Sequence, residues 1–317
     1  MLRTLTSINS TTVRLTTEIF ARRVALRASS RFAPELAAAW AERLFLTPPR
    51  ARHPERALAD FIDARPRAIM HRGRRIATWR WGARAAPVVL LAHGWGGSAR
   101  QMRNFVFPLV TAGFRVVAFD QPAHGLSEGR LTGLPDLADA FAAVAADHGS
   151  PHGELRGIVA HSFGGAAAAL ALASGRLHAA RDIPIVLIAP PSDLLGYSRR
   201  FARWYWIPER VRDAMQAAIE ERYGVRWREL EVSRLAPRLT APALVIHDRD
   251  DRIVPWNQGA YLARAWPGAR LLVTGGLGHA RILESDTVTH AAADFISGRS
   301  RVADPAWPAL PQPAPLY

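Results

Sequence analysis

The chain has 317 residues, of which 49% are apolar and 21% are charged. These fractions are ordinary for a globular protein and exclude a chain that is disordered throughout. Cysteine is absent, which excludes disulfides, thiolate metal sites and a cysteine nucleophile. The net charge is +14, and every basic residue is an arginine. Because the arginines are spread along the sequence, we interpret this charge as a compositional bias rather than as a nucleic-acid-binding surface.

Residues 1–66 are predicted to form a helical extension. Leu36, Trp40 and Leu44 recur at helical spacing, and Thr47-Pro48-Pro49 ends that helix. The first thirty residues contain five arginines, one acid and no continuous apolar core, so they do not match a secretory signal. Their composition also resembles an organelle transit peptide, which stays open as the alternative. We expect a packed extension on a cytoplasmic protein.

Residues 67–191 and 237–300 are predicted to form one core. Alternating residues at 67–82 predict a β-hairpin, and short apolar runs then alternate with helical patterns. The first helix is expected to open on a capping box of Ser98 and Gln101. Strands are predicted at 88–92, 116–119, 157–160, 185–189, 243–246 and 271–273. This alternation predicts an α/β fold, with a mostly parallel sheet covered by helices on both faces.

Three further segments have distinct patterns. Residues 157–175 lack charge and could span a bilayer by length, but a β-rich start and Gly164-Gly165 favour a strand, a turn and a buried helix. We therefore expect no integral membrane segment. Residues 192–236 interrupt the alternation and predict a helical lid, with one helix ending at Gly224. Residues 301–317 are rich in proline and predict a disordered tail.

Ser162 lies where a predicted strand turns sharply into a predicted helix. The segment Ala160-His161-Ser162-Phe163-Gly164 places small residues two positions before and two positions after the serine. Small residues relieve the crowding of a strained turn that projects a serine hydroxyl, the geometry of a nucleophile elbow. Ala160 stands where the usual pattern has glycine. The position between strand and helix predicts that Ser162 is a nucleophile.

A glycine-rich loop, His93-Gly94-Trp95-Gly96-Gly97-Ser98, follows an earlier predicted strand. Acyl transfer develops an oxyanion, which fixed N–H donors stabilise. We predict that the N–H groups of Trp95 and Phe163 form this oxyanion hole, since Phe163 also opens a helix. His93 is interpreted as a structural residue whose ring ties loops together.

A serine nucleophile needs a base, and the base needs an orienting carboxylate. Acidic residues follow one late strand in Asp248-Arg249-Asp250-Asp251, and His279 follows the next strand. Each group lies beyond the carboxyl end of a different strand, where an open α/β sheet places its site. The order serine, aspartate, histidine differs from that of the two other common serine triads.

Five segments together resemble the α/β-hydrolase family, in its serine esterase and lipase branch, over residues 67–298. They are HGWGGS at 93–98, DQPAHGLS at 120–127, AHSFGG at 160–165, DDRIVP at 250–255 and GLGHA at 276–280. The resemblance implies an α/β-hydrolase fold with the triad Ser162, Asp251 and His279. The family pattern selects Asp251 over Asp250, and DQPAHGLS is interpreted as a structural loop. Dehalogenases and epoxide hydrolases of this family use an aspartate nucleophile, which Ser162 excludes.

The predicted lid carries a cluster of aromatic residues that includes Tyr197, Phe201 and Trp204. We predict that these three bind the acyl chain of the substrate, while packing of the lid onto the body stays open. Interleaved arginines would also suit single-stranded nucleic acid, which a complete triad disfavours. Contact with a lipid surface stays open. Histidines are numerous, but none has the spacing of a metal motif, so we expect neither metal nor cofactor.

These observations together predict a serine hydrolase that cleaves a carboxylic ester or thioester of a small acyl compound. A peptidase or amidase would use the same residues and stays open as an alternative. A non-catalytic binding protein on the same fold is a further alternative, because fold alone does not imply function. The oligomeric state is not indicated by the sequence.

Overall fold

The computed structural model describes residues 10–50, 61, 63–149, 154–177 and 182–299. The chain divides into two compact units, one formed by residues 1–46 with 195–227 and the other by residues 47–194 with 228–317. The predicted disordered tail at 301–317 lies outside the described residues, as do residues 51–60 of the predicted extension.

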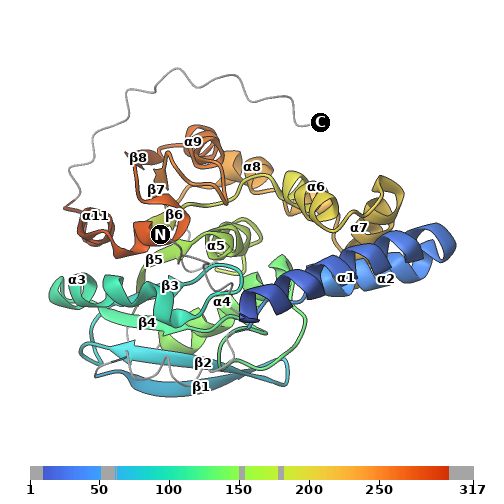
Figure 1. The fold of residues 1–317 in the computed structure, drawn as a ribbon. Helices are drawn as coiled ribbons and strands as arrows, with labels where there is room; N and C mark the ends of the chain where they lie inside the picture. Colours follow the sequence, from blue (N-terminus) through green and yellow to red (C-terminus); the bar gives the residue numbers. More distant parts are fainter. Residues whose placement is uncertain (1–9, 51–60, 62, 150–153, 178–181, 300–317) are drawn as a thin grey trace, which may run out of the picture. The chain divides into compact units, whose positions relative to one another are not determined.

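The larger unit is built on an eight-stranded sheet with the order β1-β2-β4-β3-β5-β6-β7-β8 (Figure 1). β1 and β2 form an antiparallel hairpin, and β2 is antiparallel to β4, whereas all other neighbours are parallel. The predicted hairpin and parallel sheet are therefore confirmed. The strands are β1 (Arg65–His71), β2 (Arg74–Trp81), β3 (Val88–Ala92), β4 (Arg115–Phe119), β5 (Leu155–His161), β6 (Ile185–Ile188), β7 (Ala243–Asp248) and β8 (Arg270–Thr274).

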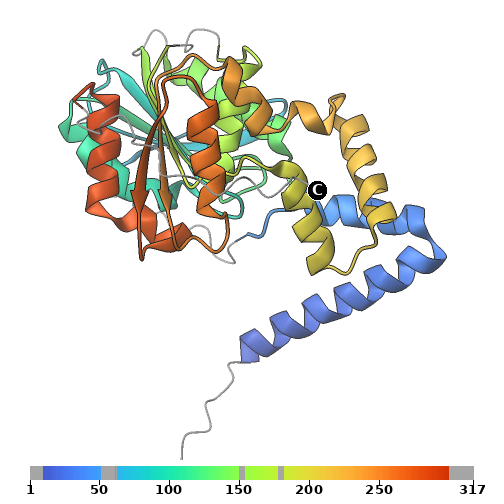
Figure 2. The same cartoon turned by 90° about the horizontal axis from the view of Figure 1, so that it is seen from above.

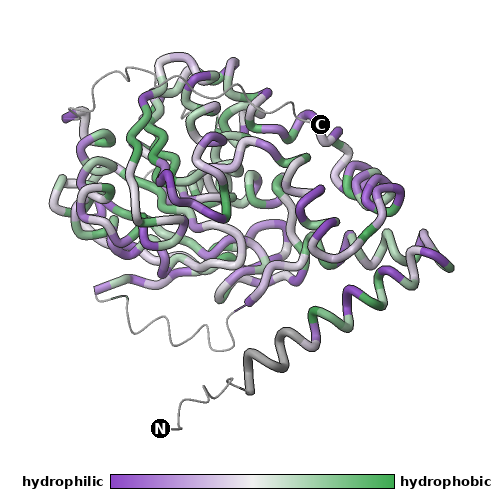
Figure 3. The backbone as a smooth tube through the Cα atoms, turned by 45° about the horizontal axis from the view of Figure 1, so that its top comes forward, coloured by the Kyte–Doolittle hydropathy of each residue, from purple (hydrophilic) through white to green (hydrophobic). Residues whose placement is uncertain are grey.

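Helices cover both faces of this sheet, as the alternating pattern predicts (Figure 2). One face carries η2 (Ala99–Phe105), α3 (Val106–Thr111) and α11 (Asp286–Ile296), and the other carries α4 (Leu134–Gly149), α5 (Phe163–Ala173) and α9 (Trp256–Ala265). All residues of β3, β4, β6 and β7 are buried, and the central strands are the hydrophobic part of the tube in Figure 3. Strands covered on both faces are continuous apolar runs for this reason.

The expected capping box at Ser98 is wrong. Ser98 takes the N-cap position of η2, but its side chain makes no capping hydrogen bond. The backbone N–H of Ala99 instead donates to the Asp120 carboxylate at 2.7 Å. Asp120 follows β4, so a distant carboxylate replaces the local cap, and the first turns form as 3₁₀ rather than α-helix.

The smaller unit contains α1 (Ser10–Phe32), α2 (Pro34–Phe45), α7 (Glu209–Tyr223) and most of α6 (Leu194–Trp204). α2 packs against both α1 and α7. α7 ends at Gly224 in the left-handed conformation, as predicted. The predicted apolar face of α2 is only partly correct, because Leu36 is 71% exposed.

The buried residues of α2 are Ala37, Ala38 and Ala41. Small side chains allow neighbouring helices to approach closely, so alanines occupy the contact face instead of Leu36. Among the described residues, no helix combines the length and apolar character needed to cross a membrane.

Candidate active site

Ser162 occupies the sharp turn between β5 and α5. Its backbone has φ 52° and ψ −125°, a conformation that non-glycine residues rarely adopt and that costs on the order of 1–3 kcal/mol. Its N–H donates to the carbonyl of Ile188 at 2.8 Å, and its carbonyl accepts from the N–H of Gly165 at 2.9 Å. The sheet and the helix thus hold the strained residue from both sides.

Two glycines make room for this turn. A side chain on Gly164 would collide with the carbonyl oxygen of His93, which follows the neighbouring strand β3. A Cβ on Gly94 would lie 2.9 Å from the Cβ of Ser162. The glycine-rich loop and the serine turn therefore approach each other to a distance that only residues without a Cβ permit.

The structure brings Ser162, His279 and Asp251 together from three different strand ends. His279 Nε2 lies 3.0 Å from Ser162 Oγ, and His279 Nδ1 lies 2.6 Å from Asp251 Oδ2. A carboxylate can only accept, so Nδ1 carries the hydrogen and Nε2 is left to accept the hydroxyl proton of Ser162. The arrangement can therefore remove a proton from the serine.

Asp251 is a buried carboxylate with partners on both oxygens. Oδ1 accepts from the N–H groups of Ile253 and Val254 at 2.8 and 2.9 Å, while Oδ2 lies 3.4 Å from His247 Nε2. Burial alone would raise the pKa of Asp251, but the hydrogen bonds from His247 and His279 lower that pKa well below its usual value. Asp251 therefore stays ionised beside the imidazole of His279.

The neighbouring carboxylates have a different task. Asp250 accepts from the N–H of Gly276 at 2.7 Å. Asp248 is fully buried and accepts from the N–H groups of Leu277 and Gly278 at 3.1 and 2.9 Å. Both therefore fix the loop that carries His279 rather than its imidazole ring.

His161 holds the backbone of the proposed base. Its Nε2 donates to the carbonyl of His279 at 3.0 Å, and the two rings have their centroids 4.7 Å apart. Burial, aided by the neighbouring His279, lowers the pKa of His161 to about 3. A neutral His161 is therefore a permanent donor to the loop of His279 over the ordinary pH range.

The predicted oxyanion residues lie next to each other. The rings of Trp95 and Phe163 pack edge to face with centroids 5.5 Å apart. The loop of Trp95 closes on itself through a hydrogen bond from Gly97 N–H to the carbonyl of Gly94 at 3.1 Å. Trp95, after β3, and Phe163, at the start of α5, thus lie on either side of Ser162. That their N–H groups donate to an oxyanion stays a prediction.

The segment from Asp120 to Ser127 braces this glycine-rich loop. Gln121 N–H donates to His93 Nε2 at 3.0 Å, and the amide of Gln121 donates to the His93 carbonyl. Leu126 N–H donates to Asp120 at 2.7 Å, and Gly125 leaves the space in which that carboxylate lies. Burial raises the pKa of Asp120 to about 6. The structural roles expected for His93 and for this segment agree with these contacts.

The three aromatic residues predicted to bind substrate belong to the smaller unit. Tyr197 and Phe201 pack edge to face on Phe45 of α2, with ring centroids 5.6 and 5.1 Å apart. Trp204 is 57% exposed, and the guanidinium of Arg23 lies 4.4 Å from the centroid of its ring. These contacts give all three a packing role within that unit, and substrate binding stays a prediction.

Sequence reasoning missed Asp248, His161 and His247 as supporting residues of the site. Asp248 and His161 lie next to predicted motifs, but their partners lie at another strand end. His247 instead contacts the Val254 carbonyl and Asp251 in the loop that follows its own strand. Within the described part of the chain, no group of three or more His, Cys, Asp or Glu side chains could hold a metal ion.

Comparison with known proteins gives the same architecture. The model of the alpha/beta hydrolase family matches residues 88–296. A pimeloyl-[acyl-carrier protein] methyl ester esterase of Neisseria meningitidis is 27% identical over 247 residues, which are 68% of this chain and 95% of that protein.

Two solved structures share the fold. Est1E from Butyrivibrio proteoclasticus, with ferulic acid bound, has a TM-score of 0.59 at 19% identity and covers 74% of this chain and 98% of its own. A bacterial membrane phospholipase A has a TM-score of 0.56 at 20% identity, and the similarity covers 90% of this chain and 98% of that protein. The second similarity extends beyond the residues that the family model matches.

Proposed function

This chain belongs to the α/β-hydrolase family and is an enzyme, and from that premise we propose that it cleaves carboxylic esters or thioesters through an acyl-enzyme on Ser162. The observation that carries the proposal is the continuous hydrogen-bonded chain from Ser162 through His279 to Asp251. The relative named as a methyl ester esterase supports an ester as the substrate class.

In the proposed reaction Ser162 Oγ attacks the acyl carbon as His279 Nε2 takes the hydroxyl proton. The buried carboxylate of Asp251 fixes the Nδ1–H tautomer and stabilises the imidazolium that forms. The N–H groups of Trp95 and Phe163 would hold the negative oxygen of the tetrahedral intermediate. His279 then returns its proton to the leaving alcohol or thiol, and an acyl group stays on Ser162.

Water completes the cycle. His279 accepts a proton from a water molecule, which attacks the acyl carbon, and the second tetrahedral intermediate expels Ser162 Oγ. His279 delivers that proton to Ser162, so the free acid leaves and the resting enzyme returns. The first and the last of these proton transfers use the 3.0 Å contact between His279 Nε2 and Ser162 Oγ, whereas the other two pass between Nε2 and the leaving group or the water molecule.

The test compares Ser162→Ala with wild type in labelling by a fluorophosphonate probe and in turnover of p-nitrophenyl esters. We expect Ser162→Ala to lose labelling and to lower kcat by about 10⁶-fold, because the nucleophile is gone. Ser174→Ala, at the other end of α5, is the matched control and should keep both. Undiminished labelling or turnover in Ser162→Ala would contradict the proposal. Faster hydrolysis of aminoacyl anilides than of esters would favour a peptidase on the same residues.

The predicted role of Phe201 and Trp204 in binding the acyl chain needs its own experiment. Burial of each methylene contributes about 0.8 kcal/mol, so two extra methylenes should raise kcat/KM about tenfold for an apolar binding site. We expect the double change of Phe201 and Trp204 to Ala to flatten this dependence over a C2 to C12 ester series. Acetate ester turnover should stay nearly unchanged. An identical slope in both proteins would leave these residues with the packing role alone.

A further inference from the structure

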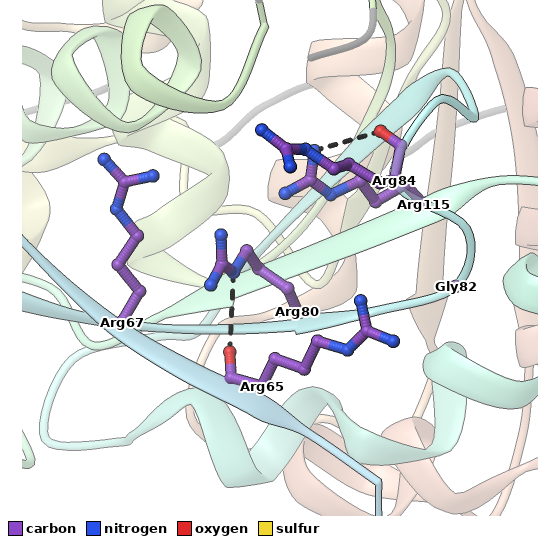
Figure 4. Close-up of a pocket in the computed structure, with 6 residues that line it drawn as sticks. All are labelled: Arg65, Arg67, Arg80, Gly82, Arg84 and Arg115. Carbon is purple, nitrogen blue, oxygen red and sulfur yellow. Dashed lines mark hydrogen bonds between the residues drawn. The ribbon is translucent and has the colours of Figure 1, made fainter.

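A hollow in the larger unit is lined almost entirely by arginine. The pocket has a volume of about 290 Å³ and lies between the hairpin β1–β2, the turn that follows it and the start of β4 (Figure 4). Its lining residues are Arg65, Arg67, Arg80, Gly82, Arg84 and Arg115. The arginines are separated by up to 50 positions in the sequence, so their meeting depends on the fold.

Strand register places four of these arginines on one face of the sheet. Arg65 is paired directly with Arg80, and Arg80 is also paired with Val117. Arg67 and Arg115 lie two positions from Arg65 and Val117, so their side chains point the same way. Like charges directly opposite each other destabilise a sheet. The hairpin therefore carries an electrostatic cost that a bound anion would remove.

Two arginines of this pocket are hydrogen-bonded to backbone carbonyls, and one of these two is buried, whereas Arg65, Arg67 and Arg84 are exposed. Arg115 is only 5% exposed and donates to the carbonyl of Arg84 at 3.3 Å, while Arg80 donates to the carbonyl of Arg65 at 3.5 Å (Figure 4). Burial and the surrounding arginines lower the pKa of Arg115. Burial and the charge of Arg67 likewise lower the pKa of Arg80.

A carboxylate from α4 approaches the group. Asp147 Oδ1 forms an ion pair with Arg67 Nη2 at 3.0 Å. The charge of Asp147 also raises the pKa of Arg80, against the effect of burial and of the other arginines. The described charges that act on the pKa of Arg115 are those of neighbouring arginines. Among the described residues, five guanidinium groups thus line the pocket beside this one paired carboxylate.

The pocket lies at the opposite end of the sheet from the candidate active site. Arg115 is the first residue of β4, whereas Ser162 follows the last residue of the parallel strand β5. The length of one five-residue strand separates these ends by roughly 16 Å. A ligand in this pocket would therefore not be the substrate of Ser162.

We propose that this arginine pocket binds a compact polyphosphate group, as carried by a nucleoside triphosphate or by a multiply phosphorylated lipid headgroup. Guanidinium groups bind phosphate oxygens through two parallel hydrogen bonds, and several of them around one hollow match a group of high charge density. The volume of about 290 Å³ and the arginine lining suit a short phosphate chain rather than a large apolar ligand.

The test is isothermal titration of the full chain with tripolyphosphate and with ATP, at ionic strength matched by sodium sulfate. Arg65→Gln with Arg80→Gln removes two cations of the pocket, and Arg238→Gln with Arg264→Gln removes two exposed cations elsewhere in the larger unit. Each lost charged contact should raise the Kd about tenfold. We therefore expect about 100-fold weaker binding when Arg65 and Arg80 are changed, and wild-type binding when Arg238 and Arg264 are changed. Ester turnover should be the same in all proteins, which shows that the variants fold.

Vesicles distinguish the two sources of the phosphate group. Binding to vesicles that contain phosphatidylinositol bisphosphate, lost only in the Arg65 and Arg80 pair, would assign a lipid headgroup. Saturable binding of tripolyphosphate and ATP without vesicle binding would assign a soluble polyphosphate. Equal binding by both variant pairs, or no saturable binding at all, would overturn the proposal. The arginines would then serve only to keep the edge strand β1 from pairing with other chains.

Discussion

The two ends of the central sheet use charge in opposite ways. At the carboxyl ends of the strands, Asp248 and Asp251 are buried, and each oxygen of these carboxylates has a hydrogen-bond donor. At the opposite end, arginines lie directly across from each other, and Asp147 is the acid that pairs with Arg67. At the carboxyl ends of the strands, the buried carboxylates find their hydrogen-bond donors within the chain. These carboxylates can therefore orient a proton transfer. The other end has an excess of positive charge, which is the property of a site for an external anion.

Among the residues that support the nucleophile, the largest effect should come from the carboxylate that orients the base. Asp251→Asn should lower kcat by about 10⁴-fold, because an amide no longer fixes the Nδ1–H tautomer of His279. Asp250→Asn is the matched control, since Asp250 contacts only the N–H of Gly276 among the described hydrogen bonds of its side chain. Steady-state kinetics on a p-nitrophenyl ester measures both. A greater loss of kcat in Asp250→Asn than in Asp251→Asn would show that Asp250, and not Asp251, orients the base.

A smaller effect is expected at His161, which holds the backbone of His279. His161→Phe keeps a ring in the buried space but removes the donor to the His279 carbonyl. We expect kcat to fall by up to about 100-fold with KM nearly unchanged, because the base is displaced while substrate contacts remain. His290→Phe, on the exposed side of α11, should leave kcat at the wild-type value. Equal kcat in the two variants would show that the loop holds its position without His161.

The smallest effect concerns acid stability at the arginine end. His148 is buried beside Asp147, and burial lowers its pKa from 6.5 to about 4. Between about pH 4 and pH 6.5, His148 is therefore protonated in the unfolded chain but neutral in the folded chain. The stability contributed by a neutral His148 is complete above about pH 6.5 and is lost as the pH falls toward 4.

Urea unfolding of wild type and His148→Gln at pH 6.5 and 5 isolates this contribution. The loss of stability between these pH values should be smaller in His148→Gln by roughly 2 kcal/mol. Asp120, whose pKa is raised, acts in the opposite direction but is common to both proteins. An unchanged difference between the two pH values would mean that His148 is protonated in the folded chain.

The sequence was sufficient for the sheet and for the chain order of the candidate triad. Buried strands are continuous apolar runs, and Ser162 follows such a run directly, while Asp251 and His279 come three and five residues after the ends of β7 and β8. Since parallel strands end at one edge, residues that follow them converge without further information. The capping box failed because the N–H of Gln101 donates to the carbonyl of Ser98 at 3.0 Å rather than to its side chain, while the N–H of Ala99 donates to Asp120, which is 21 positions away.

The arginine pocket could not be predicted for a related reason. Its residues meet only when the register of β1 on β2 and of β2 on β4 is known, and a shift of one residue would send their side chains to the other face. The same holds for His161, whose acceptor is the carbonyl of His279 at another strand end. Periodicity identifies the elements, whereas cross-strand pairing decides which polar residues share a site.

The packing of α2 on α7 has a consequence during synthesis of the chain. Glu42 of α2 pairs with Arg222 of α7, 180 positions later, and Phe45 packs on Trp227. At a translation rate of 5–20 residues per second, about 10–40 s pass between the emergence of these partners from the ribosome. The face of α2 that packs on α7 is thus exposed while most of the sheet is still being made. A chaperone that binds nascent chains would meet this helix before its own partner does.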